Sequence, residues 1–388
     1  MPPVLFLQSD VGNPYTFYET MLQENPVYWD EANQLWALYS FSACESVLTN
    51  MNAYIPAINK NNKDGLNEHA LLITKHLARL NNAIEHTIAR EMAMLLFQKM
   101  KSMAIGDMVE KILRNHNNTG EIDFVNIICK SLPVRIILKS FDFNDEDTDF
   151  VSANIEPFVK IMAANKTAEQ VKHINEIAGK IYNITEKHLL AAGIGYSIIN
   201  SLQEKYKTAQ DELTASCVSN LIGLFIQGYD AGRGVLSNSL LHILTKRNLI
   251  KEYLSDKSFI VRSVTETLRF DPPVQNTRRI AAENIFVNDT EIKKGQSILI
   301  VLAAANRDSK KFNHPGQYDV ERFNNNEHLT FGAGHHQCVA KHFSVKTTTD
   351  TLAYLFERYK NIELRENTIA YEPAINVRLP KKMMISMF

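Results

Sequence analysis

The feature that most constrains the fold is helical periodicity over most of the chain. Apolar residues recur at spacings of three and four through the stretches 67–104, 120–141, 167–191, 210–246 and 257–269. This spacing puts apolar side chains on one face of each helix, so the helices must pack together to bury them. Strand-like alternation occurs in 34–40 and 277–302, with a turn signal at Asn288-Asp289. We therefore expect a mostly α protein with a smaller β region, an α+β fold.

The domain organisation follows from length and evenness of composition. The chain has 388 residues, and domains commonly run to about 150 residues, although a single large one also fits. No repeat, low-complexity tract or clear linker divides the sequence, so we expect one domain over residues 1–388. Lys and Arg total 42 against 43 Asp and Glu, which argues against a protein that binds nucleic acid over its whole surface.

Nothing in the sequence predicts export or insertion into a membrane. The opening residues lack the basic segment and apolar run of a signal peptide. No stretch reaches the roughly 20 uninterrupted apolar residues of a membrane span. The 4 cysteines form no C-x-x-C pair, which favours a reducing compartment over a disulfide framework. We expect a cytoplasmic monomer without membrane or nucleic-acid partners.

The segment 331–342, Phe-Gly-Ala-Gly-His-His-Gln-Cys-Val-Ala-Lys-His, carries the clearest chemical signal. Its glycines Gly332 and Gly334 permit a tight turn with positive φ. From Cys338 the chain runs to Tyr359 without Gly or Pro, which predicts a helix that begins close to the cysteine. A helix N-terminus favours the thiolate form of a cysteine. A thiolate is a good axial ligand for haem iron.

Two other interpretations of this segment stay open on the residues alone. One is a surface loop that holds an ordinary buried cysteine. The other is a zinc site, because His335, His336, Cys338 and His342 lie close together in the sequence. Their spacing differs from the usual paired zinc ligands.

The pattern F-G-A-G-H-H-Q-C resembles the haem-binding loop of the cytochrome P450 superfamily, F-x-x-G-x-x-x-C. The resemblance implies that Cys338 is the axial thiolate ligand of haem b. It also implies that Phe331, Gly332, His336 and Ala340 contact this cofactor. The fold implied is that of the cytochromes P450, a triangular prism of helices around the haem.

Further motifs match the superfamily in the same order. Glu266-Thr267-Leu268-Arg269 is an E-x-x-R motif, whose spacing puts both charges on one helix face. Alone this motif is usually an exposed pair, but here P-P-V-Q-x-T-x-R and A-N-R-D follow it, as in the family. Arg322 matches the arginine that completes the family's Glu-Arg-Arg network. The resemblance implies that Glu266, Arg269 and Arg322 are structural.

Glu85-His86-Thr87-Ile88-Ala89-Arg90 resembles the bacterial E-H-T-x-x-R motif at the start of the family's C helix. His86 and Arg90 are four residues apart on one helix face and can hold an anionic group together. The resemblance implies that they bind the haem propionates, with Arg279 and His336 on the other side. An exposed helix pair is the alternative for His86 and Arg90.

The predicted helix 210–246 departs from the family pattern A-G-x-[D/E]-T-T. Here the residues read Gln227-Gly228-Tyr229-Asp230-Ala231-Gly232. Asp230 supplies the acid, but Ala231 replaces the alcohol that helps to deliver protons in the family, and its side chain makes no hydrogen bond. Gln227 stands where a small residue is usual, in one helical row with Ala231. Our candidate catalytic residues are Asp230, acting with ordered water, Ala231 and Gln227.

Several reactions fit this departure. The first is hydroxylation, with ordered water or substrate hydroxyls in place of the missing threonine. The second is an unusual oxidation such as oxidative coupling or cyclisation. The third is that of a peroxide-using peroxygenase, whose arginine would replace the acid–alcohol pair; Arg233 lies two or three residues away from that place. A non-catalytic haem-binding protein is the alternative from another class.

Analogy with the family places the substrate against 55–80, 155–185, the helical row, 273–277 and 375–380. Ile226, Val274, Asn276 and Val377 are the individual candidates for substrate binding. The mixture of aliphatic and polar residues suits a medium-sized organic molecule, either free or carrier-bound. The unusual distal motif favours a role in specialised-metabolite biosynthesis.

The family resemblance also implies separate electron donors. A ferredoxin or flavodoxin with its reductase would supply reducing equivalents to a monooxygenase of this kind. Lys341, His342 and Lys346 follow the cysteine loop closely and could steer an acidic partner toward it. The same charges are also ordinary for a solvated helix.

Overall fold

The computed structural model describes residues 3–57, 65–114, 116, 120–163, 165–191, 193–246 and 258–388. The chain divides into two compact units. Unit 1 comprises Met1–Tyr54, Ile105–Lys130 and Asp230–Phe388, and unit 2 comprises Ile55–Ala104 and Ser131–Tyr229. The prediction of one domain over 1–388 stays a prediction.

Unit 2 is built from packed helices. They are α3 (Glu68–His76), η1 (Ala78–Leu80), α4 (Ala83–Lys99), α6 (Leu132–Ser140), α7 (Asp145–Phe158), η3 (Val159–Met162), α8 (Ala168–Ala191), α9 (Ile194–Tyr206) and the first part of α10 (Gln210–Thr245). Helix α8 packs against α3, α7 and α9, while α9 also packs against α4. The predicted helices 167–191 and 210–246 correspond closely to α8 and α10.

The stretch 67–104 is largely helical, as expected, but it forms more than one helix, because α3 ends at His76 and α4 begins at Ala83. Asparagine side chains take over backbone hydrogen bonding between them. Asn82 accepts from the Ile55 N–H at 2.8 Å and donates to the Ile55 carbonyl at 3.0 Å. Asn81 donates to the Lys75 and Leu77 carbonyls. The bonds of Asn81 to nearby carbonyls are of the local kind that competes with helix continuation.

Unit 1 combines helices with two larger sheets and a hairpin. Its helices are α1 (Pro14–Glu24), α2 (Phe41–Thr49), α5 (Ile105–Arg114), the π-helix η2 (Val125–Cys129), the remainder of α10, α12 (Ser258–Phe270), α13 (Leu302–Ala305), η4 (Asn325–Glu327), η5 (Gly334–His336) and α14 (Lys341–Arg358). The predicted helix 257–269 is α12, apart from residue 257, which lies outside the described residues. The helix predicted after the cysteine is α14.

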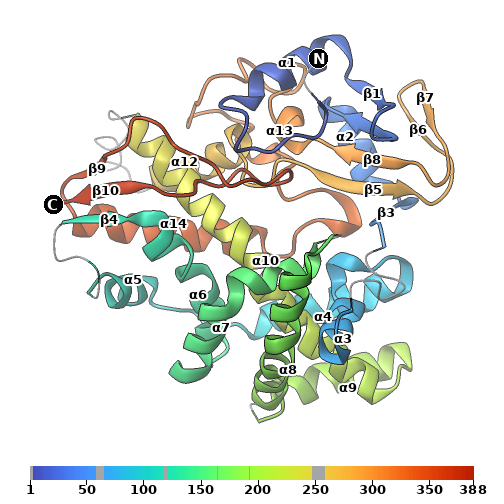
Figure 1. Cartoon of the computed structure of the whole chain (residues 1–388), viewed down its shortest axis with the longest axis vertical. Coiled ribbons are helices and arrows are strands. Elements are labelled where there is room, and N and C mark those ends of the chain that lie inside the picture. Colours follow the sequence, from blue (N-terminus) through green and yellow to red (C-terminus); the bar gives the residue numbers. More distant parts are fainter. Residues whose placement is uncertain are drawn as a thin grey trace. The chain divides into compact units, whose positions relative to one another are not determined.

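The strands of the first sheet run in the order β1-β2-β8-β5-β3. They span Val27–Asp30, Leu35–Leu38, Ser297–Ile300, Thr277–Ala281 and Ala53–Tyr54. Strands β2 and β8 pair in parallel, with Leu38 opposite Ile300. Strands β5 and β8 pair antiparallel and lie side by side in Figure 1. The predicted strands within 34–40 and 277–302 are therefore confirmed.

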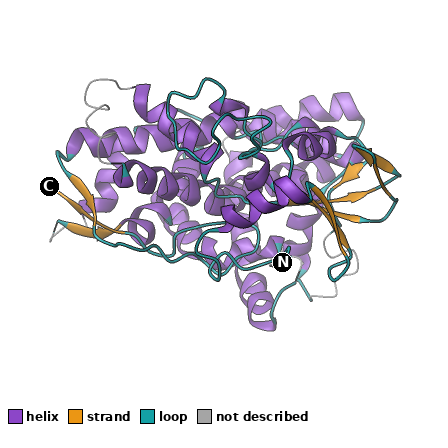
Figure 2. Ribbon diagram, turned by 90° about the horizontal axis from the view of Figure 1, so that it is seen from above, coloured by secondary structure: helices purple, strands orange, loops and turns teal. Residues whose placement is uncertain are grey.

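The other strands form a small hairpin and a separate sheet. Strands β6 (Ile285–Val287) and β7 (Thr290–Ile292) pair around the predicted turn, where Asn288 has φ 52°. Strands β4 (Glu121–Asp123), β10 (Met384–Met387) and β9 (Ile362–Leu364) form the second sheet, which lies well apart from the first in Figure 2. The predicted helix 120–141 is wrong at its start, because β4 pairs there with β10.

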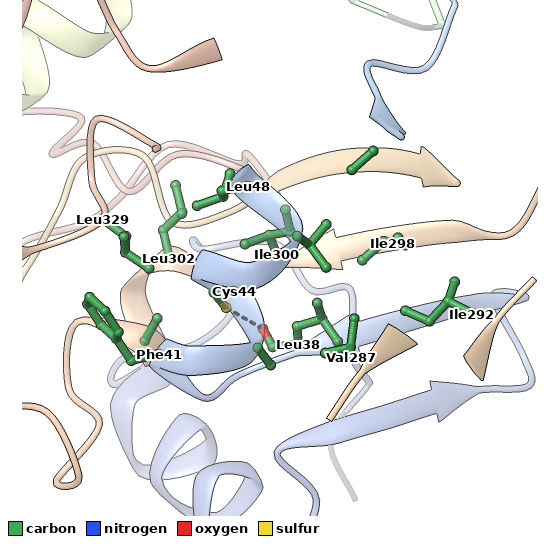
Figure 3. Close-up of a cluster of buried hydrophobic side chains, with 14 of the residues drawn as sticks. Leu38, Phe41, Cys44, Leu48, Val287, Ile292, Ile298, Ile300, Leu302 and Leu329 are labelled. Carbon is green, nitrogen blue, oxygen red and sulfur yellow. Dashed lines mark hydrogen bonds between the residues drawn. The ribbon is translucent and has the colours of Figure 1, made fainter. Parts of the chain in front are cut away.

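A buried cluster joins α2 to the first sheet (Figure 3). Leu48 of α2, Ile298 and Ile300 of β8, and Leu329 of the loop before the cysteine belong to it. Cys44 is fully buried there, and its thiol donates to the Leu38 carbonyl at 3.3 Å. The cluster therefore supports the loop that leads to Cys338.

The carboxylate of Glu266 is the centre of a buried ionic network. Arg269 donates to it through Nε at 2.9 Å and Nη2 at 2.6 Å, and both side chains are fully buried on α12. Arg322 Nε lies 3.5 Å from the same carboxylate, which also accepts the Asp319 N–H at 3.0 Å. The three residues expected to form a structural network are thus in contact.

The two arginines of this network fasten the long loop between residues 304 and 330. Arg269 donates to the carbonyls of Asn306, Pro315 and Gln317, each at 3.0 Å. Arg322 donates to the carbonyls of Asn313, His314 and Gln317. Backbone carbonyls therefore accept hydrogen bonds from the guanidinium N–H groups that do not donate to the Glu266 carboxylate. Burial of a guanidinium requires such partners.

The substitution Arg269→Ala should lower the free energy of unfolding by about 3–5 kcal/mol, because it leaves the Glu266 carboxylate buried and unpaired. Chemical denaturation of the purified protein measures this loss. Arg262→Ala, on the same helix, is the matched control. Arg262 pairs with the exposed Glu321 at 3.0 Å, and such a pair contributes about 0–1 kcal/mol. Equal losses in the two variants would contradict this account.

A second buried carboxylate, Asp271, follows α12. It accepts the Tyr15 hydroxyl at 2.6 Å and a His242 ring N–H at 3.2 Å, and Arg378 Nε lies 3.7 Å away. Burial by itself raises the pKa of Asp271, but the hydrogen bond and charge of His242, then Arg378 and Tyr15, lower this pKa to about 2. The ionised form therefore stabilises the fold.

Because the folded-state pKa of Asp271 lies below its unfolded value, its stabilising contribution is present above about pH 4 and is lost as the pH falls toward 2. Asp271→Asn should lower the free energy of unfolding by about 2 kcal/mol at pH 7. The difference from the parent protein should shrink as the pH falls from 4 to 2. Unfolding midpoints measured across that range test this, and a constant difference would contradict it.

Candidate active site

Cys338 lies at the end of a tightly folded loop just before α14. Its N–H donates to the Phe331 carbonyl at 2.8 Å, and the Gly332 N–H donates to Leu329 at 2.8 Å. Gly332 and Gly334 have φ of +69° and +66°, which glycine adopts without strain. The two predicted glycine positions are therefore where the turn needs them, and the turn fixes the cysteine backbone.

Gly334 also lies where α2 approaches the loop. A Cβ atom at this position would lie 2.7 Å from the Leu48 carbonyl oxygen and 2.9 Å from Thr49 Cα. Backbone atoms cannot move aside as a side chain would. The positive φ and this close approach both require glycine, so α2 and the cysteine loop are held in one arrangement.

Asn306 connects the buried ionic network to the cysteine loop. Its Oδ1 accepts the Leu329 N–H at 2.7 Å, and its Nδ2 donates to the Thr330 hydroxyl at 2.9 Å. That hydroxyl donates to the Leu268 carbonyl of α12 at 2.5 Å. Thr330 immediately precedes Phe331, so α12 holds the start of the loop. Sequence reasoning used Asn306 only as part of A-N-R-D and missed Thr330, for which no periodic pattern gives a signal.

The four cysteines differ in their surroundings. Cys44, Cys129 and Cys217 are buried, whereas Cys338 is exposed. Burial raises the pKa of each buried thiol, to about 12 for Cys217. The exposure of Cys338 contradicts the alternative of an ordinary buried cysteine. Among the described residues, no group of three or more His, Cys, Asp or Glu side chains is arranged to hold a metal ion, so the zinc alternative gains no support.

The residues expected to bind propionates divide between the two units. In unit 2, His86 is buried on α4 and Arg90 is half-buried one turn later. In unit 1, Arg279 is buried on β5 and donates to the Arg278 carbonyl at 2.8 Å, while His336 is half-buried in η5. Their joint binding of one cofactor stays a prediction.

Helix α10 carries the candidate catalytic residues and is α-helical from Gln210 to Thr245. Gln227 is half-buried, and its Nε2 donates to the Gly223 carbonyl at 3.0 Å. Gly234 is explained by packing, since an added Cβ would lie 2.4 Å from both Pro273 and Leu379 side chains. Ala231 is half-buried, without a polar group of its own.

Asp230 belongs to an ionic cluster that the sequence analysis did not anticipate. Arg233 reaches Asp230 Oδ1 through Nε at 3.0 Å and Nη2 at 2.9 Å. The Nη1 atom of the same guanidinium lies 3.4 Å from Glu372 Oε1. The i,i+3 spacing is a sequence signal for the first pair. No local pattern indicates Glu372, which is 139 residues distant.

Two of the expected substrate segments lie side by side in unit 1. Val274 forms an antiparallel bridge with Val377, and Asn276 Nδ2 donates to the Ile375 carbonyl at 2.9 Å. Ile226 is buried in unit 2. Parts of the expected stretches 55–80 and 155–185, namely 58–64 and 164, lie outside the described residues.

Comparison with known proteins gives a consistent result. Residues 240–386 match the family described as Cytochrome P450. Cytochrome P450 133B2 of Xylella fastidiosa is 26% identical over 385 residues, which cover 94% of each chain. Pulcherriminic acid synthase of Bacillus subtilis is 20% identical over 394 residues, 97% of this chain and 95% of the relative.

The fold is shared with solved structures. The crystal structure of P450BioI in complex with an acyl carrier protein ligated to hexadec-9Z-enoic acid matches with a TM-score of 0.80. The match covers 97% of this chain and 99% of the P450BioI chain, at 19% sequence identity. In the part of the chain that the structure describes, no helix is both long and apolar enough to cross a membrane.

The arrangement around Cys338 suits the thiolate-bound haem b of the relatives. Cys338 is exposed, its N–H donates to the Phe331 carbonyl, and the preceding loop is held by hydrogen bonds with the Asn306 side chain and with the Leu268 carbonyl of α12. The mostly α fold with a smaller sheet region is also that of the structural neighbours. The matched family over residues 240–386, the relatives of similar length and the shared fold together make this chain similar to the cytochrome P450 superfamily, whose members bind haem b.

Proposed function

We propose that this protein oxidises a medium-sized organic substrate, with Cys338 as the axial ligand of haem b. The superfamily supports a haem-dependent oxidoreductase of the monooxygenase type. The observation that carries the residue assignment is the exposed thiol of Cys338, at the end of a loop held by the hydrogen bond from its N–H to the Phe331 carbonyl. Haem, when bound, supplies the centre that activates dioxygen.

The remaining loop and helix residues hold the cofactor in this proposal. Phe331, Gly332 and Ala340 contact it beside the thiolate. The cationic side chains of His86, Arg90, Arg279 and His336 hold its two propionates, because carboxylates removed from water need paired donors. Burial of His86 and Arg279 supports this role.

On the distal side, Asp230 exchanges protons with ordered water. Ala231 supplies no hydroxyl, so water or a substrate hydroxyl takes the place of the family's threonine. Gln227 presents an amide near the substrate. Its Nε2 is engaged by Gly223 in the same helix, which leaves the amide oxygen as acceptor.

The proposed substrate lies against the aliphatic side chains of Ile226, Val274 and Val377, with the Asn276 amide nearby. A biosynthetic role, with a free or carrier-bound substrate, is supported by two of the compared proteins. One is named a pulcherriminic acid synthase, and the other is in complex with an acyl carrier protein that bears a fatty acid.

Electrons would come from a ferredoxin or flavodoxin with its reductase. A surface groove of about 420 Å³ between α12 and α14 includes Lys341, His342 and Lys346 in its lining. Lys346 pairs with Asp350 at 2.5 Å, so Lys341 and His342 are the stronger candidates for attracting an acidic protein. Complementary charge of this kind mainly raises the association rate.

The ionic cluster bears on the peroxygenase alternative. In a peroxygenase of this kind an arginine takes the place of the acid–alcohol pair, but here the Arg233 side chain is 9% exposed and already contacts two carboxylates. This arrangement favours dioxygen chemistry.

A non-catalytic haem-binding protein is the other alternative. Consumption of reducing equivalents that depends on substrate, in the presence of a complete redox chain, separates an enzyme from such a protein.

Replacement of Cys338 by Ser should abolish the strongly red-shifted Soret band of the ferrous–carbon monoxide complex, because the thiolate ligand is lost. The difference spectrum of the purified variant measures this. Cys217→Ala, which removes a buried thiol of unit 2, is the control and should keep the band. An unchanged band in Cys338→Ser would overturn the ligand assignment.

Replacement of Ala231 by Thr should raise the fraction of reducing equivalents that appears in product, since it restores the missing hydroxyl. The product formed and the reducing equivalents consumed are measured in the same assay. Ala231→Val is the matched control, because valine has the same branching without a hydroxyl and should bring no gain. A sharp loss of product in the Thr variant alone would instead indicate that a substrate hydroxyl performs this role.

A further inference from the structure

We propose that Arg233 is a positioning residue that holds Asp230 through one carboxylate oxygen and is itself held in place by Glu372. This inference rests on the proposed role of Asp230 in proton exchange and deepens it. Because Ala231 has no hydroxyl, Asp230 is the only member of the acid–alcohol pair that can move a proton. Its orientation therefore matters more here than in a chain that has both groups.

The contacts of the Asp230 carboxylate are one-sided. Both nitrogens of Arg233 that reach it, Nε and Nη2, contact Oδ1. Within the described part of the chain, Oδ2 accepts no hydrogen bond from protein. The Asp230 side chain is 33% exposed, so Oδ2 can reach water. The geometry fixes one oxygen and leaves the other to exchange protons.

Glu372 explains why the long Arg233 side chain stays in this position. The guanidinium is nearly buried, and its third nitrogen lies 3.4 Å from Glu372 Oε1. A guanidinium presents donors in a rigid planar fork. When Glu372 holds Nη1, the other two nitrogens are therefore aimed at Asp230 without freedom to turn.

The Glu372 backbone is fixed in turn. Its N–H donates to the Leu379 carbonyl at 2.9 Å, and the Arg378 N–H donates to the Pro273 carbonyl at 2.8 Å. Val377, on the same segment, is bridged to Val274. The segment that carries the proposed substrate contacts thus also anchors the arginine that orients the proton-exchanging carboxylate.

The decisive experiment is a double-mutant cycle on the haem-loaded protein with its redox partners. Arg233→Lys keeps the positive charge but loses the planar fork. It should lower the fraction of reducing equivalents that reaches product by about threefold and raise the solvent kinetic isotope effect on product formation, because misaligned proton delivery becomes slower. In an Asp230→Asn background the same change should add little, since the two residues act as one unit.

Thermal unfolding of the same four proteins gives a readout that does not depend on turnover. Direct contact predicts that the losses in unfolding midpoint are not additive. Arg114→Lys, in the exposed pair with Glu110 on α5, is the control for a general effect of arginine replacement. Additive midpoints, or an equal fall in product yield with and without the Asp230 carboxylate, would overturn the inference.

A second variant keeps the test decisive if Arg233→Lys does not fold. Glu372→Ala releases the far nitrogen of the guanidinium and should reproduce part of the loss in the parent protein, with none in Asp230→Asn. The proton exchange by Asp230 and the positioning role of Arg233 can be refuted separately. No effect of Asp230→Asn on product yield would refute the proposed proton exchange. An effect of Asp230→Asn, without any from Arg233→Lys or Glu372→Ala, would refute only the positioning role.

Discussion

The buried ion pair of Glu266 and Arg269 is the interaction on which the long loop after α13 and the cysteine loop depend. Two charges without solvent exposure are tolerated only when their remaining hydrogen-bonding groups are satisfied. Carbonyls of the long loop after α13 meet that need, so the pair fixes a segment that has little secondary structure of its own. Asn306 and Thr330 extend this order to the start of the cysteine loop.

A few fixed polar contacts also hold the candidate proton-exchanging residue of α10. There a single guanidinium, that of Arg233, lies between the carboxylates of Asp230 and Glu372. Ala231 has no hydroxyl, and Asp230 beside it has an ionic partner in Arg233. Proton delivery in this protein would accordingly depend on the orientation of one carboxylate rather than on a pair of side chains.

Sequence reasoning succeeded where the determining interactions are local. Apolar spacing predicted α8, α10 and α12, the run without Gly or Pro after Cys338 predicted α14, and the loop motif predicted the turn before Cys338. It failed where distant residues decide the conformation. Residues 121–123 form a strand because β10 lies beside them, and no periodicity in the neighbourhood reveals it. The Arg233–Glu372 contact and the hydrogen bonds of Asn306 were missed for the same reason.

The most direct test of the central claim is the difference spectrum of the ferrous–carbon monoxide complex of the purified parent protein. Thiolate ligation by Cys338 predicts a strongly red-shifted Soret band. A well-folded protein that binds no haem, or that gives a spectrum typical of histidine ligation, would contradict the assignment of Cys338 and the function built on it.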